Sequence, residues 1–246
     1  MMVDLGRGRA QAGPKVTLNT HVGQAMTPAA PTILILAAGA GTRMRGGDKL
    51  METIDQTPLL TRITRAAVAT GVTVTVVLPP NRPERRAALA GARAQIVLAR
   101  NAGQGMAESL TTGLAALPAA APVMLLLADM PEITTEDLRQ MLAAWRATPD
   151  LILRATDTEG APGHPVCFPA WARSELMELR GDEGARAILR RHAGRMRHFT
   201  LPGRHATTDL DTPGDWQEWR ASQSGTGSRA RRPLRPDRRQ GPLAAE

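Results

Sequence analysis

A glycine-rich segment with two cations is the part of the sequence whose residue types best suit chemistry. In residues 33–50 (ILILAAGAGTRMRGGDKL), an apolar run leads into a loop with glycines at Gly39, Gly41, Gly46 and Gly47. Backbone N–H groups of such a loop can approach a phosphate closely, because glycine has no Cβ to obstruct it. Arg43 and Lys49 are spaced so that one could bind each end of a triphosphate. The segment therefore predicts phosphate binding, with an ordinary strand–helix turn as the alternative.

The residues around Lys49 exclude the two commonest phosphate-binding loops. A Walker loop requires Ser or Thr directly after its lysine, whereas Leu50 follows Lys49. A dinucleotide-binding loop requires G-x-G-x-x-G; Gly39 and Gly41 begin that pattern, but Met44 stands at the third glycine position. Lys49 is nevertheless the only lysine between residue 16 and the C-terminus, which favours a specific role for it.

Acidic residues in the second half of the chain could bind a metal beside this loop. Asp129 follows the apolar run 123–128, at the end of a central strand where open α/β sheets bind ligands. Asp209 and Asp211 lie two residues apart on an extended segment and therefore on the same face. Mg²⁺ takes a few carboxylate oxygens together with substrate phosphates. The alternative for Asp129 is to cap the helix that follows, although Thr134 already supplies a cap.

Two short motifs of polar residues and glycine, GHPVCFP and GDEGAR, are suited to binding a second ligand. Arg186 in the second motif is the candidate for a ligand phosphate, because a guanidinium binds phosphate oxygens in pairs. For His164 in the first motif, a hydrogen-bonded structural role is the alternative. The sequence contains no Ser-His-Asp set and no carboxylate acid–base pair that would favour hydrolysis.

The elements that must position these residues alternate between strands and helices. Strands are predicted from apolar or β-branched runs, and helices from apolar residues at helical spacing. The predicted strands are 33–36, 72–78, 95–99, 123–128, 151–155 and 196–201. The predicted helices lie within 58–70, 84–90, 101–117, 170–179, 183–192 and 214–220, with another from Thr134. The alternation predicts an α/β fold.

The net charge of +8 suggests nucleic-acid binding until the charges are located. Residues 1–31 carry three basic residues and one acid, and residues 220–246 carry seven and two. The remaining residues have 21 basic and 20 acidic side chains, so their net charge is only +1. No aromatic residues are interleaved with the basic ones, as base stacking would require. Nucleic acid is therefore not an expected partner.

Composition divides the chain into one domain and two extensions. Residues 1–31 are rich in Gly, Ala, Thr and Gln, and residues 221–246 in Ser, Gly, Pro and Arg. Both segments lack periodicity and are predicted to be disordered. Residues 32–220 are long enough for one α/β domain of ordinary size. Met26, which begins MTPAAPTILIL, could be the true start of translation.

Cys167 is the only cysteine, so the chain can form neither an internal disulfide nor a cysteine zinc cluster. We expect it to be a small buried hydrophobic residue. No run approaches the roughly 18 apolar residues of a membrane helix. Residues 1–25 lack the apolar centre of a signal peptide. These features predict a cytoplasmic protein without a membrane partner.

Taken in order, the motifs resemble those of a known family. L-A-A-G-x-G-T-R-M followed by D-K-L is similar to the signature of the nucleotidyltransferases that activate sugars, alditols and molybdopterin. The segment around Asp129, GHP and GDxGAR resemble elements of the molybdenum cofactor cytidylyltransferases. A further run of that family matches here at Gly105, Ser109, Leu110, Gly113 and Leu114. The resemblance covers roughly residues 32–220 and implies a Rossmann-like, three-layer α/β/α nucleotidyltransferase fold with a mostly parallel sheet.

The resemblance also implies roles for individual residues. The nucleotide would be bound by Ala37, Ala38, Gly39, Gly41, Thr42, Arg43, Lys49, Gly105 and Ser109. The acceptor would be bound by Gly163, His164, Pro165, Gly181, Asp182 and Arg186, with Gly184 and Ala185 close behind. Arg43, Lys49 and Asp129 would act in catalysis. Asp129 and Asp211 would hold Mg²⁺, with Asp209 as the alternate ligand.

The reaction implied by the resemblance is transfer of CMP from CTP to the phosphate of molybdenum-bound molybdopterin, with release of pyrophosphate. L-A-A-G favours CTP, because the guanylyl relatives usually read L-A-G-G. The loop Ala40-Gly41-Thr42 departs from the family, which often has Ser or a second Arg there. Use of GTP, a sugar or alditol phosphate acceptor, a non-catalytic molybdenum cofactor carrier and a regulatory nucleotide-binding module are the alternatives. An apo-molybdenum hydroxylase of the xanthine dehydrogenase type would receive the product.

Overall fold

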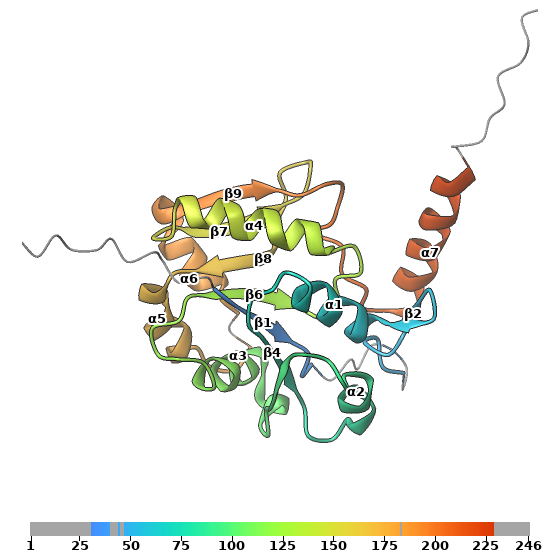
Figure 1. Cartoon of the computed structure of the whole chain (residues 1–246), viewed down its shortest axis with the longest axis horizontal. Coiled ribbons are helices and arrows are strands. Elements are labelled where there is room, and N and C mark those ends of the chain that lie inside the picture. The colour runs from blue at the N-terminus through green and yellow to red at the C-terminus, as the bar shows by residue number, and fades with distance from the viewer. Residues whose placement is uncertain (1–30, 40–43, 45–46, 183, 229–246) are drawn as a thin grey trace, which may run out of the picture.

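The computed structural model describes residues 31–39, 44, 47–182 and 184–228 (Figure 1). Most of the two predicted extensions, at residues 1–30 and 229–246, lies outside the described residues. The same holds for the loop predictions at Gly41, Thr42 and Arg43. The described residues therefore cover most of the predicted domain and a short segment after it.

A seven-stranded sheet forms the centre of the fold, with strand order β5-β4-β1-β6-β8-β7-β9 (Figure 1). The strands are β1 (Thr32–Leu36), β4 (Val74–Leu78), β5 (Gln95–Leu98), β6 (Val123–Leu127), β7 (Ile152–Thr156), β8 (Pro162–Phe168) and β9 (Met196–Thr200). β8 runs antiparallel to both of its neighbours, and all the other pairs in this sheet are parallel. The predicted α/β fold with a mostly parallel sheet is confirmed.

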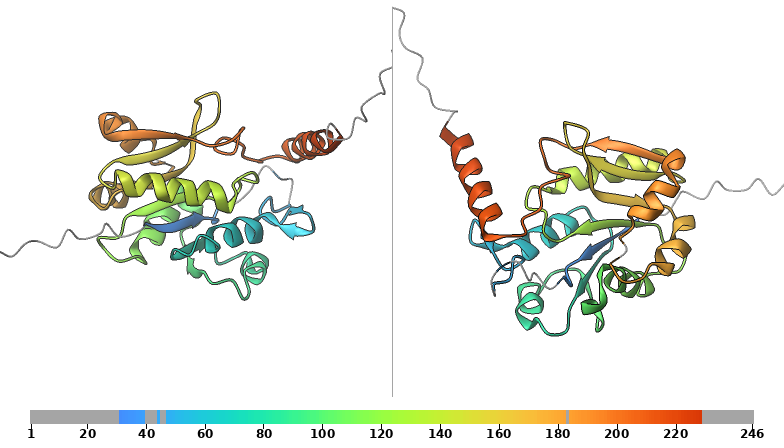
Figure 2. Two further views of the ribbon diagram at one scale, coloured as in Figure 1. Left: turned by 45° about the horizontal axis from the view of Figure 1, so that its top comes forward. Right: turned by 180° about the vertical axis from the view of Figure 1, so that it is seen from behind.

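Helices cover both faces of the sheet and make three layers. Alternate residues of β1 point to opposite layers: Ile33 and Ile35 belong to the core that contains α1 and α4, whereas Leu34 and Leu36 belong to the core that contains α3, α5 and α6. In the left view of Figure 2, α4 lies in front of the sheet. The α-helices are α1 (Leu59–Val68), α2 (Pro83–Ala88), α3 (Met106–Ala115), α4 (Thr135–Ala147), α5 (Arg173–Glu178), α6 (Arg186–Arg191) and α7 (Pro213–Ser228). Short 3₁₀ turns are Ala102–Gln104, Ala170–Ala172 and Ala193–Arg195.

The start of α4 shows that Asp129 is not needed as a helix cap. Thr134 precedes this helix, and its hydroxyl accepts a hydrogen bond from the N–H of Asp137 at 3.2 Å. The N–H of Thr134 donates in return to the Asp137 carboxylate at 2.8 Å, which completes a capping box. The carboxylate of Asp129 is therefore available for another role.

The sequence pattern does not predict β8, nor the short hairpin of β2 (Thr53–Ile54) and β3 (Thr57–Pro58). Pro162 and Pro165 argue against a strand, because proline gives no N–H to the ladder. The pairing of β8 with β6 runs through residues 166–168, after the second proline. The pairing of β8 with β7 is irregular around its first half. GHPVCFP is thus part of a strand next to β6, rather than a surface loop.

The last helix, α7, is longer than predicted. It runs eight residues beyond the predicted end at Arg220, to Ser228, although the added segment contains Gly225 and Gly227. Trp216 in its first half is 1% exposed and packs with Met44, Leu59 and Leu210, whereas the far end points away from the body (Figure 1). Neither α7 nor any other described helix is long and apolar enough to span a membrane.

Cys167 lies on β8 and is fully buried, as the sequence predicts. It packs in the same core as Met124 and Leu153 on the two neighbouring strands. Burial raises the pKa of its thiol far above the ordinary value. The thiol is therefore protonated at neutral pH and acts as a packing group.

Gly113 in α3 tests how closely this helix packs on the sheet. A Cβ added there would lie 2.6 Å from Val77 Cγ2 and 2.8 Å from Leu34 Cδ1. Because Val77 is stiff about χ1, Gly113→Ala should lower the free energy of unfolding by about 1–3 kcal/mol in urea titrations. Gly194→Ala is the control, since its Cβ would meet nothing within 4 Å, and should change stability by less than about 0.5 kcal/mol. Equal effects of the two substitutions would contradict the close packing.

Candidate active site

The described candidate residues gather at the carboxyl ends of β1 and β6. These strands are parallel neighbours, so the segments that follow Leu36 and Leu127 leave the sheet at the same edge. The N–H of Ala128 donates to the carbonyl of Leu36 at 3.1 Å and keeps the two segments side by side. The glycine loop continues from β1, and Asp129 follows β6.

Lys49 lies between two carboxylates that are distant in the sequence. Its Nζ donates to Asp129 Oδ2 at 2.6 Å and to Asp211 Oδ1 at 2.5 Å. The side chains of Lys49, Asp129 and Asp211 are only 15, 18 and 25% exposed. Burial lowers the pKa of Lys49, but the two carboxylates outweigh it, and the pKa lies above that of an ordinary lysine. Lys49 is therefore a firmly held cation at the sheet edge.

A third carboxylate, Asp209, is close enough to feel the same charges. Burial raises its pKa, the negative charges of Asp129 and Asp211 raise it further, and Lys49 partly offsets them. In addition, Asp129 Oδ1 is buried without a hydrogen-bond partner among the described residues. A buried carboxylate oxygen without a partner, beside two further acids, is the donor chemistry that a hard divalent cation prefers.

These acids fit a cation that also binds the substrate. In the described part of the chain, no group of three His, Cys, Asp or Glu residues is arranged to hold a metal unaided. Mg²⁺ often takes only one or two carboxylates and completes its shell with water and phosphate oxygens. Asp129 and Asp211 suit that partial role, and Lys49 would have to leave at least one of them.

The described residues of the predicted nucleotide side differ in exposure. Ala37 and Ala38 are buried, and Gly39 is exposed. Ser109 is 5% exposed within α3, so it has little surface to offer a base. Nucleotide contact by these residues stays a prediction. Of Ala37, Ala38, Gly39 and Ser109, only Gly39 is exposed.

Gly105 joins the predicted nucleotide side to the predicted acceptor side. It has φ +121°, and a Cβ there would lie 2.2 Å from the carbonyl oxygen of Gly181. The N–H of Ala107 donates to the same carbonyl at 3.0 Å. The start of α3 therefore rests directly on the GDEGAR loop, and only glycine permits the contact.

Gly163 has a comparable packing role in the GHP motif. A Cβ there would lie 1.7 Å from the carbonyl oxygen of Ala206. The N–H of His164 donates to that same oxygen at 2.9 Å. The contact fixes β8 against the segment that leads to Asp209 and Asp211. This contact explains why position 163 requires glycine, and the explanation does not involve a ligand.

His164 is held as a neutral imidazole. Burial lowers its pKa to about 4, and the nearby cations Arg154 and Arg186 add to the effect. A hydrogen bond to the backbone of Leu125 and the charge of Asp129 act in the opposite direction. Its Nδ1 is buried without a partner among the described residues. His164 is thus a neutral residue close enough to Asp129, Arg154 and Arg186 to feel the charges of all three.

Arg154 on β7 was not predicted and lies close enough to Arg186 to interact electrostatically. Its Nε and Nη2 donate weakly, both at 3.3 Å, to the carbonyls of Gly163 and Pro162. Burial lowers the pKa of Arg154, and the charge of Arg186 lowers it further. Neither guanidinium forms an ion pair with a described carboxylate. The sequence feature that could have identified Arg154 is a cation within the otherwise uncharged strand ILRAT.

Arg85 is the second residue that sequence reasoning missed. It is 0% exposed and forms an ion pair with Asp48 directly before Lys49. One of three arginines in the run NRPERR, it differs from its neighbours only in its tertiary position.

A hollow of about 490 Å³ opens beside Asp209. Its lining includes the side of α7 and several polar side chains: Glu132, Arg204, Asp215, Glu218 and Trp219. Trp219 is held there by a hydrogen bond from its Nε1 to Glu132 at 2.9 Å. The hollow provides room for a second ligand next to the carboxylates.

Substituting the acids and substituting Lys49 should have opposite effects on the affinity for Mn²⁺ in the absence of nucleotide. Asp129→Asn and Asp211→Asn should each weaken Mn²⁺ binding by at least about tenfold, since even indirect partners of a metal cost that much. Lys49→Met should instead strengthen it, because the lysine cation no longer occupies the two carboxylates. Electron paramagnetic resonance of free Mn²⁺ measures each affinity.

Glu175→Gln is the control for this experiment. Glu175 pairs with Arg191 and His192 outside the candidate site, and its loss should leave Mn²⁺ affinity unchanged. Weaker Mn²⁺ binding by the Lys49→Met variant would contradict the competition between lysine and metal.

His164 predicts a loss of stability on acidification. Its folded-state pKa is about 4 against an ordinary value of 6.5, so between these pH values the unfolded chain binds a proton that the folded chain excludes. The stabilisation is complete above pH 6.5 and falls as the pH drops toward 4. Between pH 7.5 and 4.5, the wild type should lose about 2–3 kcal/mol more than His164→Gln in urea unfolding. Equal losses would show that His164 is protonated when folded.

Comparison with known proteins identifies a nucleotidyltransferase domain in this chain. The chain matches the MobA-like NTP transferase domain over residues 33–196. The crystal structure of Rv0371c from Mycobacterium tuberculosis H37Rv is 28% identical with a TM-score of 0.67, covering 78% of this chain and 98% of that one. The structure of Rv0371C in complex with manganese, from the same organism, is 26% identical with a TM-score of 0.63, covering 77% and 97%.

A homolog of rv0371c from mycobacterium sp. strain JC1 is 25% identical with a TM-score of 0.67, covering 81% of this chain and 99% of that one. No curated protein matches the chain. The domain match spans well over half of the sequence and contains Lys49, Asp129, His164 and Arg186. This chain belongs to the MobA-like NTP transferase family and is a nucleotidyltransferase.

Proposed function

We propose that this nucleotidyltransferase transfers CMP from CTP to the phosphate of molybdenum-bound molybdopterin and releases pyrophosphate. The observation that carries the proposal is the contact of Lys49 with Asp129 and Asp211. A cation and two carboxylates meet there at the end of a glycine loop, at the sheet edge where α/β proteins bind ligands. The motifs on the acceptor side supply the pterin part of the proposal.

The transfer requires alignment and charge neutralisation rather than proton transfer. The attacking phosphate oxygen of the acceptor is already anionic, so no general base is needed. As it bonds to the α-phosphorus of CTP, the bond to pyrophosphate breaks and negative charge moves onto the leaving group. Lys49 would neutralise that charge after leaving one of its carboxylates. When bound, Mg²⁺ supplies positive charge to the phosphate oxygens that face Asp129 and Asp211.

The acceptor side offers two cations for an anionic group. Arg186 was predicted to bind the acceptor phosphate, and Arg154 interacts with it electrostatically. No described carboxylate pairs with either one, so an incoming phosphate would relieve their mutual repulsion. His164 would remain neutral. Pro165, Gly181 and Asp182 are proposed to shape the pterin side.

The choice of CTP rests on the resemblance of the sequence Ala37-Ala38-Gly39 to the cytidylyl members of the family. GTP remains the alternative nucleotide. A non-catalytic carrier of the molybdenum cofactor would not need the carboxylate pair around Lys49. We further propose an apo-molybdenum hydroxylase of the xanthine dehydrogenase type as recipient of the product.

A sugar or alditol phosphate is the second candidate acceptor, because of the hollow beside Asp209. Several carboxylates line it, including Glu132 and Glu218, and Trp219 forms part of its wall. Carboxylates accept hydrogen bonds from hydroxyl groups, and a tryptophan ring offers an apolar face to a sugar. Such a surface suits a neutral polyhydroxyl chain better than another anion.

Single-turnover release of pyrophosphate tests the proposal. Purified protein, Mg²⁺ and molybdenum cofactor are mixed in parallel with CTP, GTP, ATP or UTP. Release is expected with CTP alone, and Asp129→Ala should slow it by at least about a hundredfold, as loss of one charge-stabilising group does elsewhere. Glu175→Gln serves again as the folded control and should release pyrophosphate at the wild-type rate.

Each other outcome assigns a different function. Release with GTP would retain the mechanism and overturn the choice of base. Tight cofactor binding without release from any nucleotide would indicate the carrier. Neither binding nor release with molybdenum cofactor, followed by release with a sugar or alditol phosphate, would assign the second acceptor.

A further inference from the structure

Arg85 is a fully buried arginine that uses four hydrogen bonds in two directions. Its Nε and Nη2 donate to the two carboxylate oxygens of Asp48 at 2.7 and 2.8 Å. Its Nη1 donates to the carbonyls of Ala37 at 2.6 Å and Gly39 at 2.9 Å. The Arg85 side chain is 0% exposed and that of Asp48 is 7% exposed, so solvent does not compete for these bonds.

The partners of Arg85 stand on the two sides of the glycine loop. Ala37 and Gly39 open the loop after β1, and Asp48 ends it directly before Lys49. One side chain from α2 therefore ties the entry of the loop to its exit. The tie fixes the distance between these two ends, so a phosphate that binds near them does not have to remove that conformational freedom.

The bonds to the carbonyls also orient the loop backbone. In a trans peptide, the C=O of one residue and the N–H of the next point in opposite directions. Because the carbonyl of Ala37 faces the buried Arg85, the N–H of Ala38 faces away from it. Arg85 thus holds the carbonyls of Ala37 and Gly39 on its own side, and the N–H of Ala38 lies on the other side, where it could donate to an anion.

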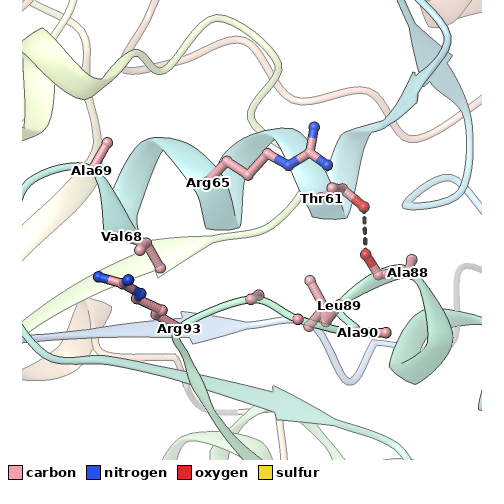
Figure 3. Close-up of a pocket in the computed structure, with 10 residues that line it drawn as sticks. Thr61, Arg65, Val68, Ala69, Ala88, Leu89, Ala90 and Arg93 are labelled. Carbon is pink, nitrogen blue, oxygen red and sulfur yellow. Dashed lines mark hydrogen bonds between the residues drawn. The ribbon is translucent and has the colours of Figure 1, made fainter.

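The helix that carries Arg85 is itself held at its far end. The hydroxyl of Thr61 on α1 donates to the carbonyl of Ala88 at the end of α2, at 2.8 Å (Figure 3). A hollow of about 300 Å³ lies between these elements. Arg65 and Arg93 are among the residues that line it (Figure 3). The contact with α1 holds α2 in place, and with it the position from which the Arg85 side chain reaches Asp48, Ala37 and Gly39.

We propose that Arg85 is a positioning residue for the nucleotide. It holds the two ends of the glycine loop in place, Ala37 and Gly39 at one end and Asp48 next to Lys49 at the other, and does not touch the nucleotide itself. The inference rests on the proposed function only in taking the glycine loop as the nucleotide site. It assigns to Arg85 an effect on nucleotide affinity that an ion pair serving stability alone would not have.

Replacing Arg85 separates the two roles. Arg85→Lys keeps the charge, but a lysine cannot reproduce the two-oxygen pairing and two carbonyl bonds of the guanidinium. We expect the dissociation constant for CTP with Mg²⁺ to rise at least about tenfold, as it does for partners that orient a ligand group, and KM for the acceptor to stay within about twofold. Isothermal titration and steady-state kinetics measure these values.

Two further variants guard against a trivial loss of folding. Arg86→Met, at the next position of α2, removes an exposed arginine and should leave CTP affinity unchanged. The double variant Arg85→Met with Asp48→Leu replaces the buried ion pair by apolar side chains, which proteins often accept without loss of stability. If the pair only stabilises the fold, this double variant melts near the wild type and binds CTP normally, which would overturn the proposal.

A readout that needs no nucleotide keeps this test distinct from that of the proposed function. Hydrogen exchange of the amides at 37–39 and 47–49 should be faster in folded Arg85→Lys than in the wild type, while α4 exchanges equally in both. Unchanged exchange in the loop would refute the positioning role whichever nucleotide the enzyme uses. Faster exchange in Arg85→Lys, together with a wild type that binds no CTP, would support the role and refute only the choice of CTP.

Discussion

The rest of the site depends on one buried arrangement of charge, the cation of Lys49 between the carboxylates of Asp129 and Asp211. A partly buried charge without a partner is costly, so each group requires the others to be present. Asp129 is 80 residues and Asp211 is 162 residues from Lys49 in the sequence. The three segments can therefore meet only when the sheet has brought their ends to one edge. These charges can therefore pair only when the candidate site has been assembled at this edge, and their pairing in turn stabilises that assembly.

Two glycine contacts hold segments of the candidate site together. Gly105 touches the backbone of Gly181 and joins the predicted nucleotide side to the predicted acceptor side, whereas Gly163 touches that of Ala206 and joins β8 to the segment before Asp209. Each contact joins backbone directly to backbone, so no rotatable side chain stands between the joined segments. Motif glycines are commonly assigned to ligand contact, whereas these two are already required by packing. A rigid distance between two substrates is what a reaction governed by alignment needs.

Local pattern predicts the fold and two parts of the site, because a strand run and the polar residues that directly follow it can be located without tertiary information. Lys49 in the glycine segment and Asp129 after the run 123–128 are found in this way. The choice of Asp211 over Asp209 rests on the family resemblance, and the contact of Lys49 with both carboxylates is not predicted. β8 is not predictable in this way, since its prolines argue against a strand while its neighbours β6 and β7 provide the pairing. The roles of Arg85 and Arg154 are not predictable for a related reason. An arginine is assigned to the surface unless its buried partners are known. Here those partners are backbone carbonyls and side chains that are distant in the sequence.

The distribution of charge around His164 bears on the kind of acceptor that the site can use. The charges near His164 act on it in opposite directions: Asp129 favours its protonation, whereas Arg154 and Arg186 oppose it. Burial is the largest effect, and together with the two arginines it keeps His164 neutral. A charged imidazole would weaken the attraction of the acids for a cation and would repel both arginines. Under the proposed function, an acceptor that places its anionic group near Arg154 and Arg186 would meet complementary charge there, while a neutral His164 leaves the attraction of the acids for a cation undiminished.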